Sequence, residues 1–248
     1  MPQRYRPDPA TNPLRQLWHA LLGGIDQAVA VGWTGIAAMA LGLAAGWWLY
    51  VPLHELAHAF GCLAAGGEVT RLEIAPEYGA AWLARWLPFI AVGSDYAGQL
   101  TGFDTGGSDG VYLATVLAPY LLTLFPGIPL LLLLCARRTG LAASAGFGAS
   151  LPWALAPLLS LSGDYYEAGS ILASRAGALL TDRGEFAVAI WRSDDLFRLV
   201  AELSARGALD AVNSAGIAAG LVLGTVLALA TLWFAITVFQ WMTKSAKP

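Results

Sequence analysis

Two histidines and a glutamate form the run His54-Glu55-Leu56-Ala57-His58. Residues four apart lie on one face of an α-helix, so the two imidazoles can reach the same metal ion. Glu55 projects beside them, where its carboxylate can accept a proton from water. The pattern therefore predicts a zinc ion at His54 and His58, with Glu55 as general base, and it indicates metal-assisted hydrolysis.

These polar side chains stand in an apolar stretch, residues 36–65, that is long enough to cross a bilayer. An ionisable side chain at membrane depth costs about 2.5 to 3.5 kcal/mol on insertion scales, so we expect a metal to offset that cost. In the alternative interpretation, the histidines only hydrogen-bond neighbouring helices and Glu55 is protonated. That alternative leaves the shared helical face unexplained, and the metal hypothesis is preferred.

Two histidines on one helix need a third protein ligand from another part of the chain. We favour Asp164, because two prolines and Gly163 precede it and predict a broken helix, which exposes polar groups at membrane depth. Asp164 followed by Glu167 is equally typical of a helix start, with Asp as the cap and Glu in the first turn. The other candidate ligands are Glu167, Asp104 and Cys62.

Composition indicates a membrane protein. Hydrophobic residues make up 57% of the 248 residues and charged residues only 12%. Since a membrane span needs about 20 apolar residues, we predict an all-α polytopic membrane protein with four to five transmembrane helices, integral to the cell membrane. Residues 166–180 are either a fifth span or the continuation of the third after a break. The four clear spans are residues 36–65, 111–135, 141–161 and 212–241.

The chain divides into four parts by composition. A polar N-terminal segment (1–35) precedes an apolar core (36–180), a charged segment (181–211) and a C-terminal helix with a basic tail (212–248). Within the core, residues 68–74 alternate like a short strand, and an amphipathic or re-entrant element around Trp82 and Trp86 follows. Glycines at 102–110 predict an exposed loop. Regular apolar positions in the charged segment predict an amphipathic helix on the membrane surface.

The net charge of −3 provides no basic surface, which argues against a nucleic-acid partner. Four spans would place both termini on one side of the membrane. The basic residues of that side lie close to the span ends, a distribution that favours the cytoplasm.

In these features the chain resembles the site-2 protease family of intramembrane zinc metalloproteases. The resemblance is carried by the HELAH turn late in an apolar span, by the strand-like run after it, and by an aspartate at a proline-flanked break in a later span. It implies zinc on His54, His58 and Asp164, with Glu55 as the catalytic base. It also implies that the substrate is a membrane-spanning or membrane-bound protein, cut within the lipid bilayer. The family usually has Leu-Asp-Gly after an Asn-Pro run, whereas here Tyr165 follows Asp164.

Three further interpretations stay open. The strand at residues 68–74 could capture an unwound substrate segment by strand addition, or it could be a short structural edge. The whole protein could be an inactive, protease-like scaffold that binds membrane clients, but the intact Glu55 argues against that. It could also be a metal carrier, although polar residues along the spans are sparse.

Overall fold

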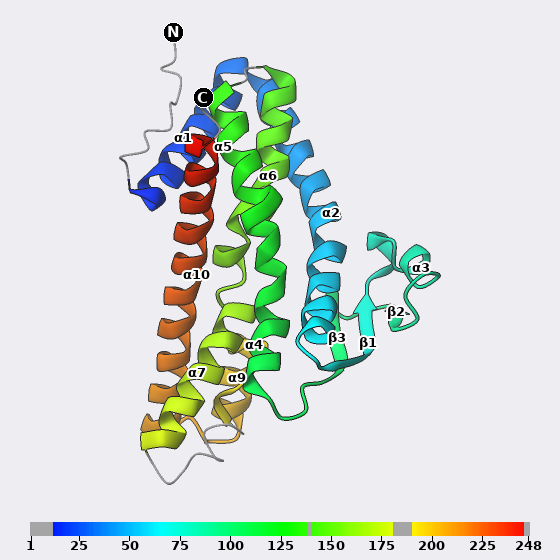
Figure 1. Ribbon diagram of the computed structural model, residues 1–248, viewed down its shortest axis with the longest axis vertical. Helices are drawn as coiled ribbons and strands as arrows, with labels where there is room; N and C mark the ends of the chain where they lie inside the picture. Colours follow the sequence, from blue (N-terminus) through cyan, green and yellow to red (C-terminus); the bar gives the residue numbers. More distant parts are fainter. Residues whose placement is uncertain (1–11, 138–139, 181–189, 246–248) are drawn as a thin grey trace.

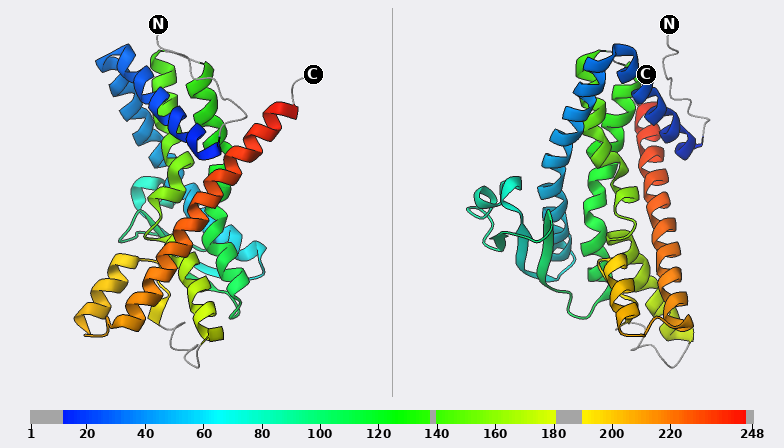
Figure 2. Two further views of the ribbon diagram at one scale, coloured as in Figure 1. Left: turned by 90° about the vertical axis from the view of Figure 1, so that its left-hand side faces the viewer. Right: turned by 180° about the vertical axis from the view of Figure 1, so that it is seen from behind.

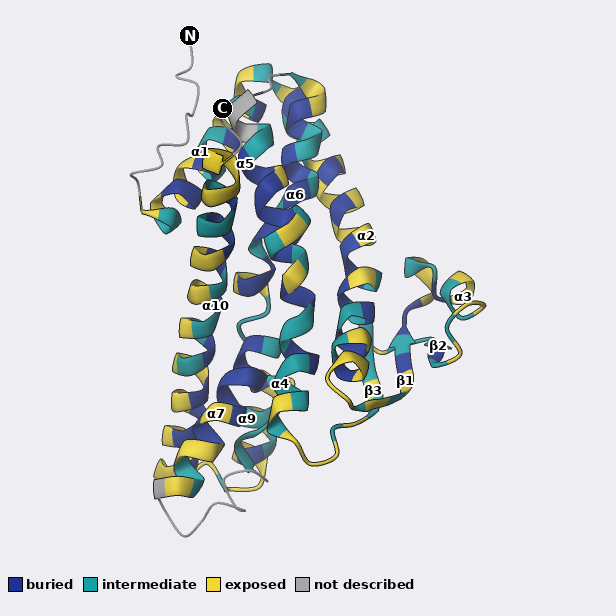
Figure 3. Ribbon diagram, viewed as in Figure 1, coloured by how far each residue is buried: buried dark blue, intermediate teal, exposed yellow. Residues whose placement is uncertain are grey.

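The computed structural model describes residues 12–137, 140–180 and 190–245, and helices dominate these parts of the chain (Figure 1). Four helical stretches are long and apolar enough to cross a membrane, as the sequence predicted. Figure 3 shows buried residues on the inward faces of these helices and exposed residues on the outward faces. The four stretches are Trp33–Ala64, Asp109–Leu134, Leu141–Leu179 and Ala211–Ser245.

Two of these four stretches are interrupted. The second is built from α4 (Asp109–Leu117), the short turns η2 (Ala118–Tyr120) and η3 (Thr123–Gly127), and α5 (Ile128–Arg137). Pro119 and Pro126 lie in those turns, where proline removes a backbone donor.

The third stretch consists of α6 (Leu141–Leu159) and α7 (Asp164–Leu180), separated by a turn at residues 160–163. The predicted break before Asp164 is therefore confirmed, and residues 166–180 continue the third stretch after it. The two uninterrupted stretches are α2 (Trp33–Ala64) and α10 (Ala211–Ser245).

A small sheet corrects the all-α prediction. Strand β1 (Glu68–Ile74) lies between β2 (Ile90–Val92), to which it is parallel, and β3 (Gly98–Asp104), to which it is antiparallel. The sheet lies beside the lower part of α2, outside the row of long helices (Figure 1). The glycine-containing run at 102–110 is therefore only partly a loop, because β3 ends at Asp104 and α4 begins at Asp109.

The expected amphipathic element after the first strand has two short helical pieces, η1 (Pro76–Tyr78) and α3 (Ala80–Leu83). They pack with the sheet on the lower part of α2, where Leu72 and Ile74 are fully buried. β1 is the central strand, so the interpretation of it as a structural edge is wrong for residues 72–74, which pair on both sides. Residues 68–71 pair with β3 but have no strand partner on the side of β2, so strand addition by a substrate there stays a prediction. The outer edges of the sheet belong to β2 and β3.

Two further helices flank the bundle. Helix α1 (Pro13–Val31), which the sequence analysis did not predict, buries Leu17 and Ala20 against the central helices. Gln240 of α10 donates a hydrogen bond to Gln16 of α1, so these helices meet at one end of the bundle (Figure 2). Helix α9 (Leu196–Ala205) lies within the segment predicted to be an amphipathic helix and is one; residues 181–189 of that segment lie outside the described residues.

Glycines allow the helix that begins with Asp164 to contact α10 backbone to backbone. A Cβ atom added at Gly224 of α10 would lie 2.2 Å from the carbonyl oxygen of Tyr165, and one added at Gly169 of α7 would lie 2.1 Å from the carbonyl oxygen of Gly220. Side chains at these positions would force the helices apart, because the neighbouring atoms belong to the backbone and cannot rotate away. Close packing through small residues is a common way for membrane helices to associate.

The substitution Gly224→Ala should therefore destabilise the protein by about 1 to 3 kcal/mol, the usual range for overpacking. It should also weaken metal binding, since Tyr165 adjoins Asp164. Gly220→Ala on the same helix is the matched control, because its added Cβ would meet Ser170 Cα at 3.2 Å and requires only a small adjustment. Thermal unfolding in detergent measures both variants. Equal losses would show that the contact at Tyr165 has no special role.

Candidate metal centre

The two histidines of α2 and the aspartate at the start of α7 converge on one point. The Nε2 atoms of His54 and His58 lie 3.1 Å apart, and Asp164 Oδ2 lies 3.2 Å from the first and 3.6 Å from the second. Both histidines are buried, and about a fifth of the Asp164 side chain is exposed. The structure thus brings together the three residues that the sequence singled out, from segments more than 100 positions apart.

These spacings fit a bound metal ion. Three ligands of a tetrahedral ion with bonds of about 2.0 to 2.1 Å lie about 3.3 to 3.4 Å from one another. The three separations within the group scatter around that value. His54, His58 and Asp164 could therefore hold a metal ion with little rearrangement.

The Nδ1 atom of each histidine, which is the ring nitrogen that does not face the other two residues, also has a hydrogen-bond partner. His58 Nδ1 lies 2.9 Å from the backbone oxygen of Thr115 in α4. A carbonyl oxygen can only accept, so Nδ1 carries a proton, and in the neutral imidazole this leaves the lone pair on Nε2 free to bind a metal ion. His54 Nδ1 lies 2.6 Å from the hydroxyl of Tyr50, one turn earlier on α2. Such partners orient metal-binding histidines and fix their tautomers.

The carboxylate of Asp164 is fixed by a residue from the interrupted second stretch. Tyr120 of η2 donates a hydrogen bond of 2.7 Å to Asp164 Oδ2. The Tyr120 ring in turn packs against Tyr165, with centroids 4.4 Å apart. Among the described residues, the partners of this carboxylate are Tyr120 and the two histidines, and no first-turn backbone N–H is one of them. This geometry favours Asp164 as a ligand over Asp164 as a helix cap.

The other candidate ligands point elsewhere. Glu167 Oε1 accepts a 2.5 Å hydrogen bond from the hydroxyl of Tyr112. Asp104 accepts from the backbone N–H of Gly106, and the Cys62 thiol contacts the carbonyl oxygen of Glu68 at 3.6 Å. Within the described residues, only His54, His58 and Asp164 form a group with metal-binding geometry.

Glu55 lies beside this group and faces a cavity of about 940 Å³, which His58 and Asp164 also line. Its carboxylate makes no hydrogen bond to any described residue. Strand β3 covers it closely, since a Cβ atom added at Gly98 would lie 2.4 Å from Glu55 Cγ. The cavity extends between β3, α4, α7 and α9, and it gives water and larger molecules access to the metal group.

Several of these contacts were missed by sequence reasoning. Tyr50 stands four residues before His54, on the same helical face, and this spacing was a usable signal. Thr115, Tyr120 and Gly98 reach the site only through long-range packing, which no local pattern in the sequence reveals.

We compared the chain with protein-family models, with curated proteins and with solved structures, and none of the three comparisons found a match.

Removing a ligand should remove the metal. We expect His58→Ala and Asp164→Ala to lose most of the bound metal when the purified proteins are analysed by elemental mass spectrometry. Glu167→Ala is the matched control on α7, and it should keep much more, because Tyr112 holds that carboxylate away from the histidines. If Glu167→Ala loses metal and Asp164→Ala keeps it, the third ligand is Glu167.

The contact between Gly98 and Glu55 can be tested through stability alone. Gly98→Ala should lower the melting temperature because the new methyl group meets Glu55 Cγ, and most of that loss should disappear in Gly98→Ala/Glu55→Ala. Gly102→Ala is the control on the same strand, since its added Cβ meets Thr70 and Arg71 instead. Its effect should not change when Glu55 is replaced. If both glycine variants respond alike to Glu55→Ala, β3 does not position that residue.

Proposed function

We propose that the protein is a zinc-dependent intramembrane endopeptidase, similar to the site-2 proteases. The observation that carries the proposal is the convergence of His54, His58 and Asp164 next to a carboxylate, Glu55, that faces an open cavity. The four apolar helical stretches support a membrane setting for this site.

Zinc is the metal that we assign to the centre. Two imidazole nitrogens and one carboxylate oxygen form a typical donor set of catalytic zinc sites, which keep the fourth position for water or substrate. The cavity beside Asp164 and His58 is consistent with such an open position. When bound there, zinc would lower the pKa of water towards neutrality and polarise the carbonyl group of a peptide bond.

Proton transfer during hydrolysis is assigned to Glu55. Glu55 accepts a proton from the attacking water as the new C–O bond forms, and it delivers that proton to the nitrogen as the C–N bond breaks. Thr115 and Tyr50 hold the imidazole rings in place during both steps, and Tyr120 holds the Asp164 carboxylate. No other described side chain in this group is required to exchange a proton.

The shape of the site favours an extended substrate segment over a helical one. A helix hides its carbonyl groups in its own hydrogen bonds, so a membrane-spanning substrate must unwind before it is cut. The free edge strand β3 lines the cavity with Gly98, Gln99 and Leu100. An unwound peptide could pair with that edge, which makes β3 a second candidate for strand addition beside β1.

The site lies toward the end of the bundle that is opposite α1. His54 follows the start of α2 by 21 residues, or about 32 Å of helix rise, which is about the full thickness of the hydrocarbon core. We therefore propose that cleavage occurs near one membrane interface. The proposed orientation has both termini in the cytoplasm and the protein in the cell membrane, on the basis of the basic residues near the span ends.

The decisive test is Glu55→Gln in a reconstituted bilayer that contains single-span substrate proteins. This variant should retain zinc, because Glu55 is not a ligand, but its kcat should fall by about 10²- to 10⁴-fold because the base is missing. Mass spectrometry of the products locates the cuts, and a soluble unfolded protein is the control substrate. Full activity of Glu55→Gln, or cuts confined to the soluble control, would refute the proposal.

A further inference from the structure

One buried carboxylate in the cavity has no role in the mechanism above. Glu167 of α7 is only 8% exposed and lines the same cavity as Glu55, His58 and Asp164. Tyr112 donates a hydrogen bond to Glu167 Oε1, whereas Oε2 has no partner among the described residues. A nearly buried carboxylate without a cation beside it is costly, so a cationic group that reaches Glu167 through the cavity would be bound favourably there.

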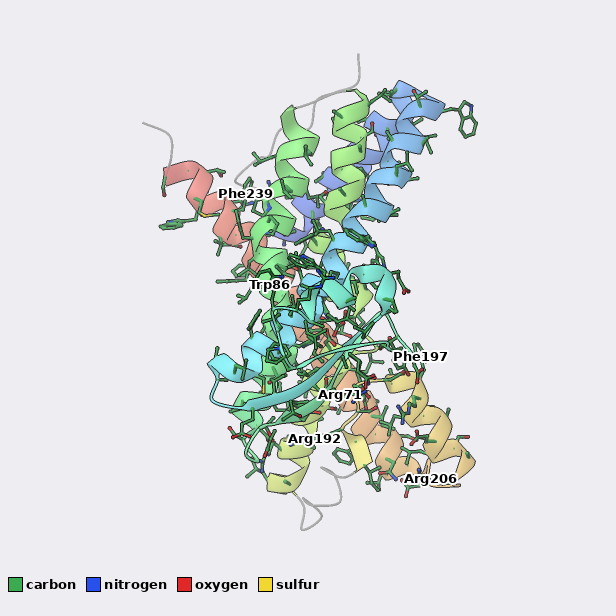
Figure 4. All side chains as sticks on the ribbon, turned by 90° about the vertical axis from the view of Figure 1, so that its right-hand side faces the viewer. Arg71, Trp86, Arg192, Phe197, Arg206 and Phe239 are labelled. Atoms are coloured by element: carbon green, nitrogen blue, oxygen red, sulfur yellow. The ribbon has the colours of Figure 1, made fainter. Side chains whose placement is uncertain are left out.

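The cationic side chains that line the cavity are already engaged. Arg192 binds both carboxylate oxygens of Asp109 and also bonds Ser174. Arg198 and Arg206 both pair with Glu202 of α9. Figure 4 shows Arg192 and Arg206 in the lower half of the molecule, the half that contains the sheet. None of the three forms an ion pair with Glu167.

A metal ion at the histidines does not resolve this imbalance. A divalent cation would be balanced by Asp164 and Glu55 together, with neutral histidines as its other ligands. An ionised Glu167, which lines the same cavity, would then have no counter-charge among the described residues. A cationic group that enters the cavity would be attracted to this position, and low dielectric surroundings strengthen that attraction.

We propose that Glu167, oriented by Tyr112, is a specificity subsite that binds a lysine or arginine side chain of the substrate next to the scissile bond. The inference rests on the proposed peptidase function and names the substrate feature that the cavity selects. Glu167 stands three residues after Asp164, and side chains at that spacing on a helix lie about 5 to 6 Å apart at Cβ. A lysine or arginine side chain within a residue or two of the cleaved bond can therefore reach Glu167 while the bond lies at the metal.

The test uses single-span substrate peptides in lipid nanodiscs, identical except that one lysine near the cleavage site is replaced by norleucine. Norleucine keeps the aliphatic side chain and removes the charge. For the unaltered protein, we expect kcat/KM to be about 10- to 100-fold higher for the lysine peptide at one position, the usual gain from a charged hydrogen bond. In Glu167→Gln, which keeps an acceptor for Tyr112, that ratio should fall close to one while the metal content is retained. Glu202→Gln is the matched control in the same cavity, and it should keep the lysine preference.

A binding measurement separates this inference from the peptidase proposal. In the Glu55→Gln background, the lysine peptide should bind about tenfold more tightly than the norleucine peptide, and adding Glu167→Gln should abolish the difference. This preference without any cleavage by the unaltered protein would support the subsite and refute the peptidase function. Cleavage and binding with no lysine or arginine preference at any position would refute the subsite alone. A second metal equivalent that disappears in Glu167→Gln would also refute it, since the counter-charge would then be a metal.

Discussion

The whole arrangement depends on the approach of one carboxylate to two imidazoles in an apolar bundle. Asp164 Oδ2 lies within 3.6 Å of both Nε2 atoms. With both imidazoles neutral these electron-rich atoms would repel one another, so the approach requires a metal ion or a proton on an imidazole. A bound metal ion would turn this repulsion into three coordinate bonds. If the centre holds a metal ion, the stability of the site is linked to that ion.

Most other features of the fold hold that approach in place. The turn at residues 160–163 ends α6 and lets α7 begin at the level of the histidines. Gly224 of α10 allows α10 to lie against the backbone of Tyr165, next to Asp164. Tyr120 and Thr115 both come from the interrupted second stretch, so that stretch contacts the carboxylate and one histidine at once. The sheet also contributes to the site. Strand β3 lies close over Glu55 at Gly98, which has no side chain to prevent the approach.

The sequence predicted those parts of the structure that a local pattern encodes. The length of the apolar segments predicted the four spans. The spacing within HELAH predicted two histidines on one face of a helix, and the prolines and Gly163 predicted the break before Asp164. The three-stranded sheet was missed because β2 has only three residues and pairs with β1 across a long connection. Helix α1 was missed because a partly polar segment buries only a few positions, and their partners come from distant helices. The tyrosines that surround the site were missed for the same reason, except Tyr50, which its spacing from His54 could have revealed.

The details of the site also bear on the two alternative functions. A metal carrier needs ligands that exchange readily along a path, whereas here Thr115, Tyr50 and Tyr120 each fix one ligand from outside, as expected for a resident ion. A scaffold that only binds clients has no need for an acid like Glu55, which lines the cavity beside the histidines and has no hydrogen-bond donor among the described residues. A base that must accept and release a proton requires such freedom, because a carboxylate engaged by fixed donors would be a weaker base. The unengaged state of Glu55 is thus the feature that favours hydrolysis over both alternatives.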